Sequence, residues 1–107
     1  MIINHRTYTI TPRKMGPYLK LVEEAALPIM RRHGFELAGY YVAMHGRLNQ
    51  VVHLWKYDSM ADMERKRASR DADPAWADFL AATEGMLQAA EDRIMTPSRF
   101  SPDFIAE

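Results

Sequence analysis

The stretch "FELAGYYVAMHGRLNQVVHLWKYD", residues 35–58, decides the fold of this chain. Both of its halves are rich in aromatic and β-branched residues, which are typical of strands. Between the halves, Gly46 and Asn49 can take the positive φ angles that a reversing chain requires. The stretch therefore predicts a hairpin of two antiparallel strands.

A turn centred on residues 47–48 would fix which hairpin residues face each other. It pairs Tyr40 with Trp55 and Val42 with His53. Both sides of this hairpin then carry mainly apolar residues, whereas a sheet with one solvated face alternates apolar with polar residues. We therefore expect a second copy of the chain to cover the outer face, in a homodimer.

The rest of the chain supplies two more strands and two helical regions. Residues 2–10 are rich in β-branched and aromatic residues and predict a strand. Apolar residues recur at helical spacing over residues 17–33, where Pro28 predicts a kink. The remaining predicted elements are helices that begin after Ser59 and after Asp73, and a strand over residues 87–95.

The resulting order, βαββαβ, predicts an α+β fold of the ferredoxin-like type, with a four-stranded antiparallel sheet and both helical regions on one face. A chain of 107 residues fits one domain, so residues 1–107 are expected to form a single unit. Segment 97–107 carries Phe100 and Phe104 among polar residues, and we expect this tail to dock on the body or on a partner chain.

Composition excludes several classes of function. Fourteen basic and fourteen acidic residues cancel, so charge gives no reason to expect a nucleic-acid partner. No run approaches the roughly 20 apolar residues of a membrane span, and we expect no membrane insertion. Cysteine is absent, which excludes disulfides and thiolate chemistry, and no export segment is recognisable at the N-terminus. A cytoplasmic location is the expectation.

The charged side chains suggest no metal or cofactor site. The four histidines fall on separate predicted elements, and the sequence contains no HExxH motif. We therefore expect neither a metal nor another cofactor. The basic residues of segment 65–70 are surrounded by acidic ones and are expected to form a solvated helix face.

His53 is the candidate catalytic residue. It lies between apolar neighbours in a predicted central strand, so its ring should be withdrawn from water and hydrogen-bonded. One interpretation makes it a general base or a ligand-orienting group near Trp55 and Tyr40. The other makes it a buried core histidine with one satisfied nitrogen, or part of a dimer seam.

Arg6 and Tyr8 lie two residues apart on the first strand and therefore share one face. They offer a cation and a phenol to an anion such as a carboxylate, or else they form contacts across a dimer interface. With Tyr40, Tyr41 and Trp55 they are the predicted ligand-binding residues. Trp76, Phe79 and Leu80 are expected in the core beneath the sheet, without a ligand role.

Three segments together resemble the NIPSNAP family of dimeric α+β barrel proteins: "GRLNQVVHLWKYDSMADMERKRA" (46–68), "DPAWADFL" (73–80) and "RTYT" (6–9). The resemblance covers residues 2–102 and implies two sheets that close face to face into a barrel across a dimer. The chain departs from the family's first strand, which resembles Glu-Leu-Arg-x-Tyr, because Asn4 and His5 precede Arg6 here. Any role of that acid is in doubt.

The resemblance implies little chemistry, because no reaction is firmly tied to the family. The wider superfamily includes cofactor-independent monooxygenase-like and isomerase-like enzymes, which favours a small-molecule pocket by analogy. Two functions therefore stay open. The chain binds or transforms a small organic molecule between sheet and helices, or it is a non-catalytic dimeric interaction module. A void beside His53 would favour the first, and a filled core the second.

Overall fold

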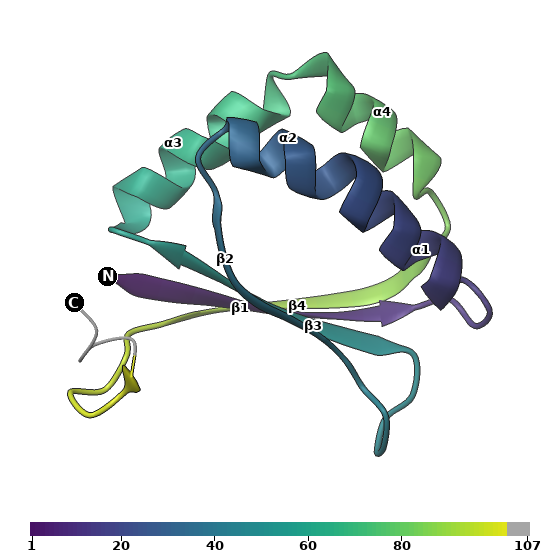
Figure 1. Cartoon of the computed structure of the whole chain (residues 1–107), viewed down its shortest axis with the longest axis horizontal. Coiled ribbons are helices and arrows are strands. Elements are labelled where there is room, and N and C mark those ends of the chain that lie inside the picture. The colour runs from purple at the N-terminus through teal and green to yellow at the C-terminus, as the bar shows by residue number, and fades with distance from the viewer. Residues whose placement is uncertain (103–107) are drawn as a thin grey trace.

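The computed structural model describes residues 1–102 and contains four strands and two helical regions on one side of them (Figure 1). All predicted elements are present in the predicted order. The strands are β1 (Ile2–Ile10), β2 (Glu36–Val42), β3 (Gln50–Tyr57) and β4 (Leu87–Met95). The helical segments are α1 (Met15–Leu21), η1 (Val22–Ala26), α2 (Leu27–Arg32), α3 (Met60–Asp71) and α4 (Pro74–Ala82).

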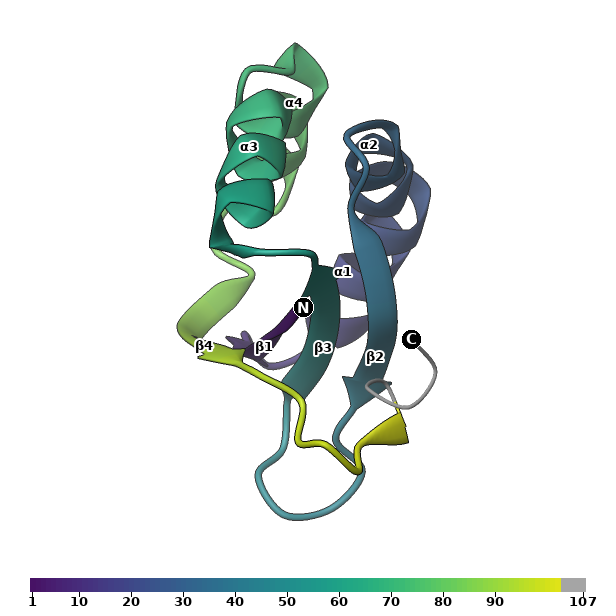
Figure 2. The same ribbon diagram turned by 90° about the vertical axis from the view of Figure 1, so that its left-hand side faces the viewer.

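The strands form one antiparallel sheet in the order β2-β3-β1-β4. The two central strands are therefore the first and third of the chain, as in the predicted ferredoxin-like arrangement. The helices cover one face of this sheet in two arms, α1 to α2 and α3 to α4, which stand side by side in Figure 2. The α+β fold predicted from the sequence is confirmed.

The hairpin register differs from the predicted one by two positions. Tyr40 lies opposite His53, and Leu37 lies opposite Trp55. The loop is longer than expected, because the chain closes with the amide of Ala43 donating to the carbonyl of Gln50. A shift of two residues leaves each side chain on its predicted face. Its consequence is that Tyr40, and not Val42, is the neighbour of His53.

The first helical region changes its hydrogen-bond pattern next to Pro28. The five residues of η1 form a π-helical turn, and the amide of Leu27 donates to the carbonyl of Val22. Pro28 has no amide hydrogen, and its ring would clash with a carbonyl four residues earlier in a regular α-helix. The predicted interruption thus takes the form of a π-turn, which is a common way to bend a helix.

Side-chain caps begin both helices of the second arm. Ser59 Oγ accepts a hydrogen bond from the amide of Asp62, and the carboxylate of Asp62 accepts one from the amide of Asp58. Asp73 Oδ1 accepts from the amide of Ala75 at the start of α4. Each cap satisfies an amide that has no partner within its own helix, so the sequence signals for both helix starts are confirmed.

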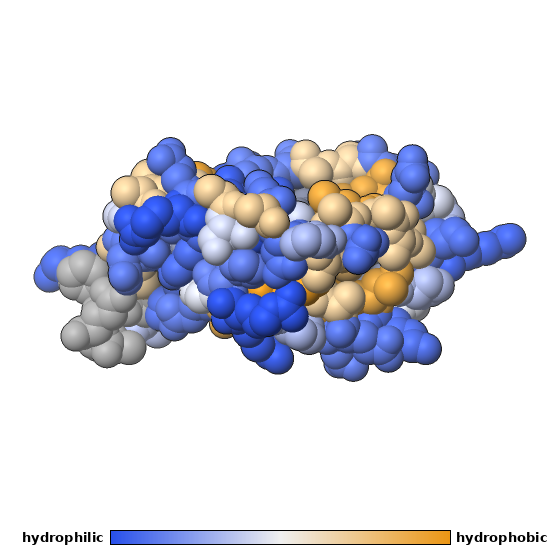
Figure 3. Space-filling view, turned by 90° about the horizontal axis from the view of Figure 1, so that it is seen from above, coloured by the Kyte–Doolittle hydropathy of each residue, from blue (hydrophilic) through white to orange (hydrophobic). Residues whose placement is uncertain are grey.

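Two groups of buried side chains fill the space between the sheet and the helices. One lies under α1 and α4 and includes Ile10, Val51 and Phe79. The other lies near α3 and includes Phe35 and Trp55. In the view from above, apolar residues gather over the half of the molecule where α1 and α4 lie (Figure 3).

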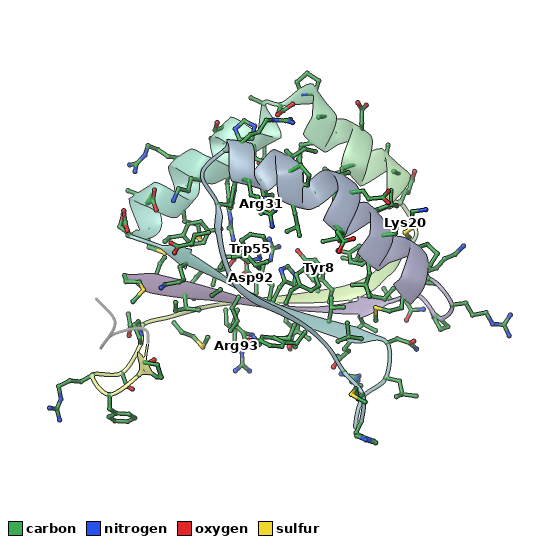
Figure 4. All side chains as sticks on the ribbon, viewed as in Figure 1. Tyr8, Lys20, Arg31, Trp55, Asp92 and Arg93 are labelled. Carbon is green, nitrogen blue, oxygen red and sulfur yellow. The ribbon has the colours of Figure 1, made fainter. Side chains whose placement is uncertain are left out.

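The outer face of the sheet is mixed in polarity. Tyr41, Val52 and Leu54 lie on it within the hairpin. The neighbouring strands add polar residues to this face, however, and Arg93 points away from the helices (Figure 4). The sheet is open in the single chain, so its apolar hairpin patch is available to a partner.

The tail lies beyond the end of β4. Phe100 is 79% exposed, so its ring does not dock on the body of its own chain. Docking of the tail on a partner chain stays a prediction. Phe104 lies outside the described residues. Within residues 1–102, no helix is long and apolar enough to cross a membrane.

Candidate functional site

A pocket of about 450 Å³ lies between the sheet and the two helical arms. Strands β1 and β3 supply its floor, the η1 and α2 segments supply one wall, and α4 supplies the other. A cavity of this size is within the range of small-molecule sites. The polar residues that line it are Arg6, Tyr8, Tyr18, Tyr40, His53, Arg70, Asp71 and Thr83.

His53 lies at the centre of the pocket floor among other rings. Tyr40 stacks on the imidazole with 4.7 Å between ring centroids, and Tyr8 meets it edge-on at 4.6 Å. Tyr8 and Trp55 point from the sheet toward the helices (Figure 4). The side chain of His53 is only 5% exposed. Its orientation is therefore fixed by packing as well as by hydrogen bonding.

The hydrogen bond of His53 defines which nitrogen carries its proton. Trp55 Nε1 donates to His53 Nδ1 over 2.7 Å, and an indole N–H can only donate. Nδ1 is therefore the acceptor, and in the neutral ring the hydrogen is on Nε2. Burial, with further contributions from Arg6 and His5, lowers the pKa of His53 to about 3. The ring is neutral at physiological pH.

Two nitrogen atoms at this site are buried without a hydrogen-bond partner within residues 1–102: His53 Nε2 and Arg6 Nε. Both are N–H donors in this state, and Arg6 lies directly opposite His53 in the pairing of β1 with β3. A buried donor that lacks an acceptor costs about 1 to 3 kcal/mol, more when it is charged. Because folded proteins seldom retain such groups, this pair is a candidate ligand contact.

The tyrosines around His53 are also donors. Burial, the main cause, raises the pKa of Tyr40 to about 12 and raises the pKa values of Tyr8 and Tyr18. The hydroxyls of Tyr18 and Tyr40 share a hydrogen bond. These phenols stay protonated at neutral pH, so the pocket is rich in donors.

Arg70 closes the pocket from the side of α3. Its guanidinium carbon lies 4.4 Å from the ring centroid of Trp76 and 5.1 Å from that of Phe35. Its Nε donates to Asp71 over 3.1 Å, and the side chain of Asp71 is itself mostly exposed at the rim. This cation is therefore placed by aromatic faces, which attract it through their quadrupoles.

A polar network lies on the same face at the border with β4. The side-chain amide of Asn4 donates to Asp92 Oδ1 and to the carbonyl of Arg93, and its oxygen accepts from Arg67. Arg67 also lies 3.5 Å from Asp92 Oδ2. Asn4, the residue at which the first strand departs from the resemblance, is thus fully buried and engaged in structure. The partners of Asp92 reduce its availability to a ligand.

The structure brings five of the six predicted site residues together. Arg6, Tyr8, Tyr40, His53 and Trp55 all line the pocket. Tyr41 lies apart from them, because it faces Val52 on the outer side of the sheet and is 57% exposed. Its ring lies over Gly39, where a Cβ atom would clash with it.

The helix α4 has a different role from the one predicted. Phe79 is buried in the core, as expected, but Leu80 is 54% exposed, and the prediction of a core position for Leu80 is wrong. Trp76, Phe79 and Leu80 all line the pocket. Trp76 and Phe79 stack on each other with 5.0 Å between their centroids, and both rings belong to the apolar lining of the pocket.

Sequence reasoning missed Tyr18 and Arg70 as pocket residues. Tyr18 was included in the apolar helical stripe, and Arg70 in a solvated basic face. Arg70 is only 8% exposed, so the prediction of a solvated face is wrong at this position. A signal was present, because Met63, Arg67 and Arg70 recur at spacings of four and three residues and so share one side of α3.

A serine–histidine–aspartate contact occurs outside the pocket. Ser69 Oγ lies 2.6 Å from His33 Nδ1, and His33 Nε2 lies 2.8 Å from Asp73 Oδ2. Asp73 also accepts from Arg32 and caps α4. These residues tie α2 to the second helical arm. Among the described residues, no group of three His, Asp or Glu side chains could hold a metal ion.

The comparison with known families identifies the chain. The model of the NIPSNAP family matches residues 3–102. The chain belongs to the NIPSNAP family. It is 34% identical over 91 residues to human Protein NipSnap homolog 3A, a match that covers 83% of this chain and 36% of that protein. This chain therefore spans about a third of the length of the curated NIPSNAP relatives that it matches.

Solved structures of NIPSNAP proteins share the whole fold. A NIPSNAP family protein of unknown function from Agrobacterium tumefaciens, Atu4242, is 38% identical with a TM-score of 0.91, over 95% of this chain and 92% of that one. An uncharacterized NIPSNAP domain protein from Burkholderia xenovorans is 32% identical with a TM-score of 0.90, over 96% and 100% of the two chains. A candidate antibiotic biosynthesis monooxygenase from Bacteroides thetaiotaomicron, 21% identical with a TM-score of 0.70 over 90% and 88%, shares the fold alone.

Proposed function

We propose that this NIPSNAP chain binds a small organic molecule in the pocket between sheet and helices, and that it does so as a homodimer in the cytoplasm. The observation that carries the proposal is the pair of buried donors, His53 Nε2 and Arg6 Nε, within a cavity of about 450 Å³. A void beside His53 was the feature that would separate a ligand-binding protein from a purely structural one.

Binding is a better interpretation than acid–base catalysis by His53. The ring is neutral, and its Nδ1 lone pair already accepts a hydrogen bond from Trp55. His53 could take up a proton only by losing that bond and by becoming charged in a buried position, both of which are unfavourable. Its role is that of a fixed donor which orients a ligand.

A more specific form of this proposal is that the chain is a cofactor-independent enzyme of the monooxygenase or isomerase type. It would use the donors of the pocket to stabilise negative charge on a bound substrate, as preorganised donors do in many enzymes. Its support is the analogy of fold with the candidate monooxygenase from Bacteroides thetaiotaomicron. Chromatography coupled to mass spectrometry separates turnover from binding, because it detects both the added oxygen of a monooxygenase product formed under air and an isomer of unchanged mass.

The outer face of the sheet supports the homodimer. Its hairpin half presents Tyr41, Val52 and Leu54, and a second copy of the chain offers a matching surface by symmetry. Phe100, which is exposed in the single chain, is available to dock on that partner. A non-catalytic interaction module built on this face is the second candidate function.

The test is a ligand screen with a blocked pocket as its control. Ala77 is exposed and lines the pocket, so Ala77→Trp should obstruct it without disturbing the core. Ala81 is exposed on the same helix but does not line the pocket, so Ala81→Trp is the matched control. Ligands should be found by native mass spectrometry of the protein from its own cells and by thermal-shift screening of aromatic acids and amides. Ala77→Trp should abolish their binding, whereas Ala81→Trp should not.

A further inference from the structure

The two unpaired donors at the pocket floor point to the chemistry of the ligand. Arg6 and His53 are opposite each other on the central strands, and neither Arg6 Nε nor His53 Nε2 has a hydrogen-bond partner among the described residues. The bond from Trp55 to Nδ1 fixes Nε2 as the protonated nitrogen, so the imidazole presents a donor there. The pocket floor therefore holds two neighbouring N–H groups, and a single acceptor could bind both of them.

The carboxylates nearest to this pair are already engaged. Asp92 accepts from Asn4 and lies 3.5 Å from Arg67. Asp71 accepts from Arg70 and is exposed at the rim. The pocket lining adds the hydroxyl of Tyr8 and the cation of Arg70 to the two donors. Asp92 also lies opposite Arg6 in the pairing of β1 with β4, and its charge acts on His53 and Tyr8. The floor therefore offers positive charge and hydrogen-bond donors, and Asp92, which already has its own partners, offsets part of that charge.

The walls restrict the rest of the ligand. Trp76 and Phe79 stack in one wall, and apolar residues of the first helical arm form the other. Aromatic and aliphatic side chains on both sides favour a ligand with an apolar body. The apolar residues opposite are Val22, Ala26, Leu27 and Met30.

We propose that the ligand is a largely apolar molecule with an oxyanion, and that this oxyanion binds between Arg6 Nε and His53 Nε2. A carboxylate and an enolate share the required chemistry, because each accepts charge-assisted hydrogen bonds from two donors at once. The ring of Tyr8 contacts both the Arg6 guanidinium, at 5.2 Å, and the imidazole, at 4.6 Å. The Tyr8 ring must therefore move aside as the oxyanion arrives. The inference rests on the proposed ligand-binding function of the pocket.

Pairs of probes that have nearly the same shape, one an acid and the other its amide, test whether binding depends on the negative charge of the ligand. The pairs are benzoate with benzamide, 1-naphthoate with 1-naphthamide, and indole-3-acetate with indole-3-acetamide, titrated at pH 7 by calorimetry. For at least one pair, the acid should bind about tenfold or more tightly than its amide, because only the acid offers an anionic acceptor. Arg6→Gln should weaken binding of the acid more than binding of the amide, and so remove most of that difference.

Three further variants define the outcome. Arg31 is exposed on α2, so Arg31→Gln matches the charge change of Arg6→Gln and should leave the preference for the acid intact. Arg6→Lys, which keeps the charge, should restore part of the preference. His53→Phe removes the donor and keeps a ring. If circular dichroism shows that Arg6→Gln does not fold, the affinities of acid and amide are compared in His53→Phe instead.

The results separate this inference from the function on which it rests. If acid and amide bind equally and Ala77→Trp abolishes both, the pocket binds ligands but the oxyanion inference is overturned. The same conclusion follows if the preference for the acid persists in both Arg6→Gln and His53→Phe. If none of the six probes binds the wild-type protein, the proposed binding function and the inference both fail for flat aromatic molecules.

Discussion

Trp55 Nε1 lies 2.7 Å from His53 Nδ1, on the same strand two residues away, and donates a hydrogen bond to it. Because Nδ1 accepts this bond, the single N–H hydrogen of the neutral imidazole is on Nε2. The two residues therefore act as one unit, in which an indole determines what a histidine can offer to a ligand. Three features of this unit can be measured: its tautomer, its titration and its effect on stability.

His53 should remain a neutral Nε2–H tautomer throughout the physiological range. Burial, followed by the charges of Arg6 and His5, lowers its pKa to about 3, so the ring should not titrate between pH 5 and 8. Nitrogen-15 NMR of histidine-labelled protein distinguishes the two tautomers and the imidazolium. An imidazolium signal from His53 above pH 5 would contradict the assignment.

The same pKa shift should make stability depend on pH. Because the pKa of His53 is lowered from 6.5 to about 3 on folding, the unfolded chain binds a proton between these values that the folded chain does not. The folded state should therefore lose stability as pH falls from 6.5 toward 3, by at most about 1.4 kcal/mol per pH unit from this group. Urea unfolding at fixed protein concentration measures this slope.

A pair of variants isolates the contribution of His53 to this slope. His53→Gln removes the titrating group and should flatten the decline in unfolding free energy between pH 6.5 and 3. His45→Gln, at an exposed loop position, should follow the wild-type curve. Parallel curves for wild type and His53→Gln would show that other groups cause the pH dependence.

Neighbouring positions of α4 should differ sharply in their effect on stability. Phe79 is buried against the core, so Phe79→Ala should cost about 3 to 5 kcal/mol in unfolding free energy. Leu80 is more than half exposed, so Leu80→Ala should change it by roughly 0.5 kcal/mol or less. Urea unfolding of the two variants is the measurement, and similar losses in both would show that the helix presents a different face.

The contrast between these two positions shows how far the sequence specifies the site. Spacing places Phe79 and Leu80 together on an apolar stripe, but adjacent residues lie about 100° apart around a helix. Only one of them can face the core centre. The starts of α3 and α4 were predictable, in contrast, because Ser59 and Asp73 cap them with local hydrogen bonds.

Which residues neighbour each other on the pocket floor depends on the pairing register of β2 with β3, and the local sequence did not determine this register. Gly46 and Asn49 do adopt positive φ angles, as predicted. The loop nevertheless closes two positions away from the simplest turn, and β2 has an irregularity between Leu37 and Gly39. Such shifts are determined by pairing along the whole strand. Tyr40 and His53 consequently stack, although the sequence placed each opposite another residue.

Asp73 should stabilise the fold through its charge. Hydrogen bonds from Arg32, then from His33 and the amide of Ala75, hold the pKa of its carboxyl below the usual 3.8. A carboxylate with a lowered pKa contributes stability above its unfolded pKa, and this contribution is lost as pH falls below that value. Asp73→Asn keeps a good helix cap, so it should reduce stability at pH 7 and reduce it less at pH 3, where the unfolded chain has begun to bind a proton at this carboxyl while the folded chain has not.

The comparison for Asp73 is Asp78, which is exposed on the same helix. Asp78→Asn should leave the unfolding midpoint in urea close to that of the wild type at both pH values. If the two variants lose the same stability at pH 7, the contacts of Asp73 with Arg32 and His33 contribute nothing measurable.

The homodimer should depend on the apolar hairpin patch of the outer sheet face. Leu54 lies on this face in the central strand β3, and an arginine there would bury an unpaired charge in the proposed interface. We expect the wild-type protein to sediment as a dimer at micromolar concentration, with an interface well above about 1,000 Å². Leu54→Arg should shift it to a folded monomer, whereas Met44→Arg, in the exposed hairpin loop, should remain dimeric. A wild-type monomer, or a Leu54→Arg variant that stays fully dimeric, would show that the outer face is not the contact between copies.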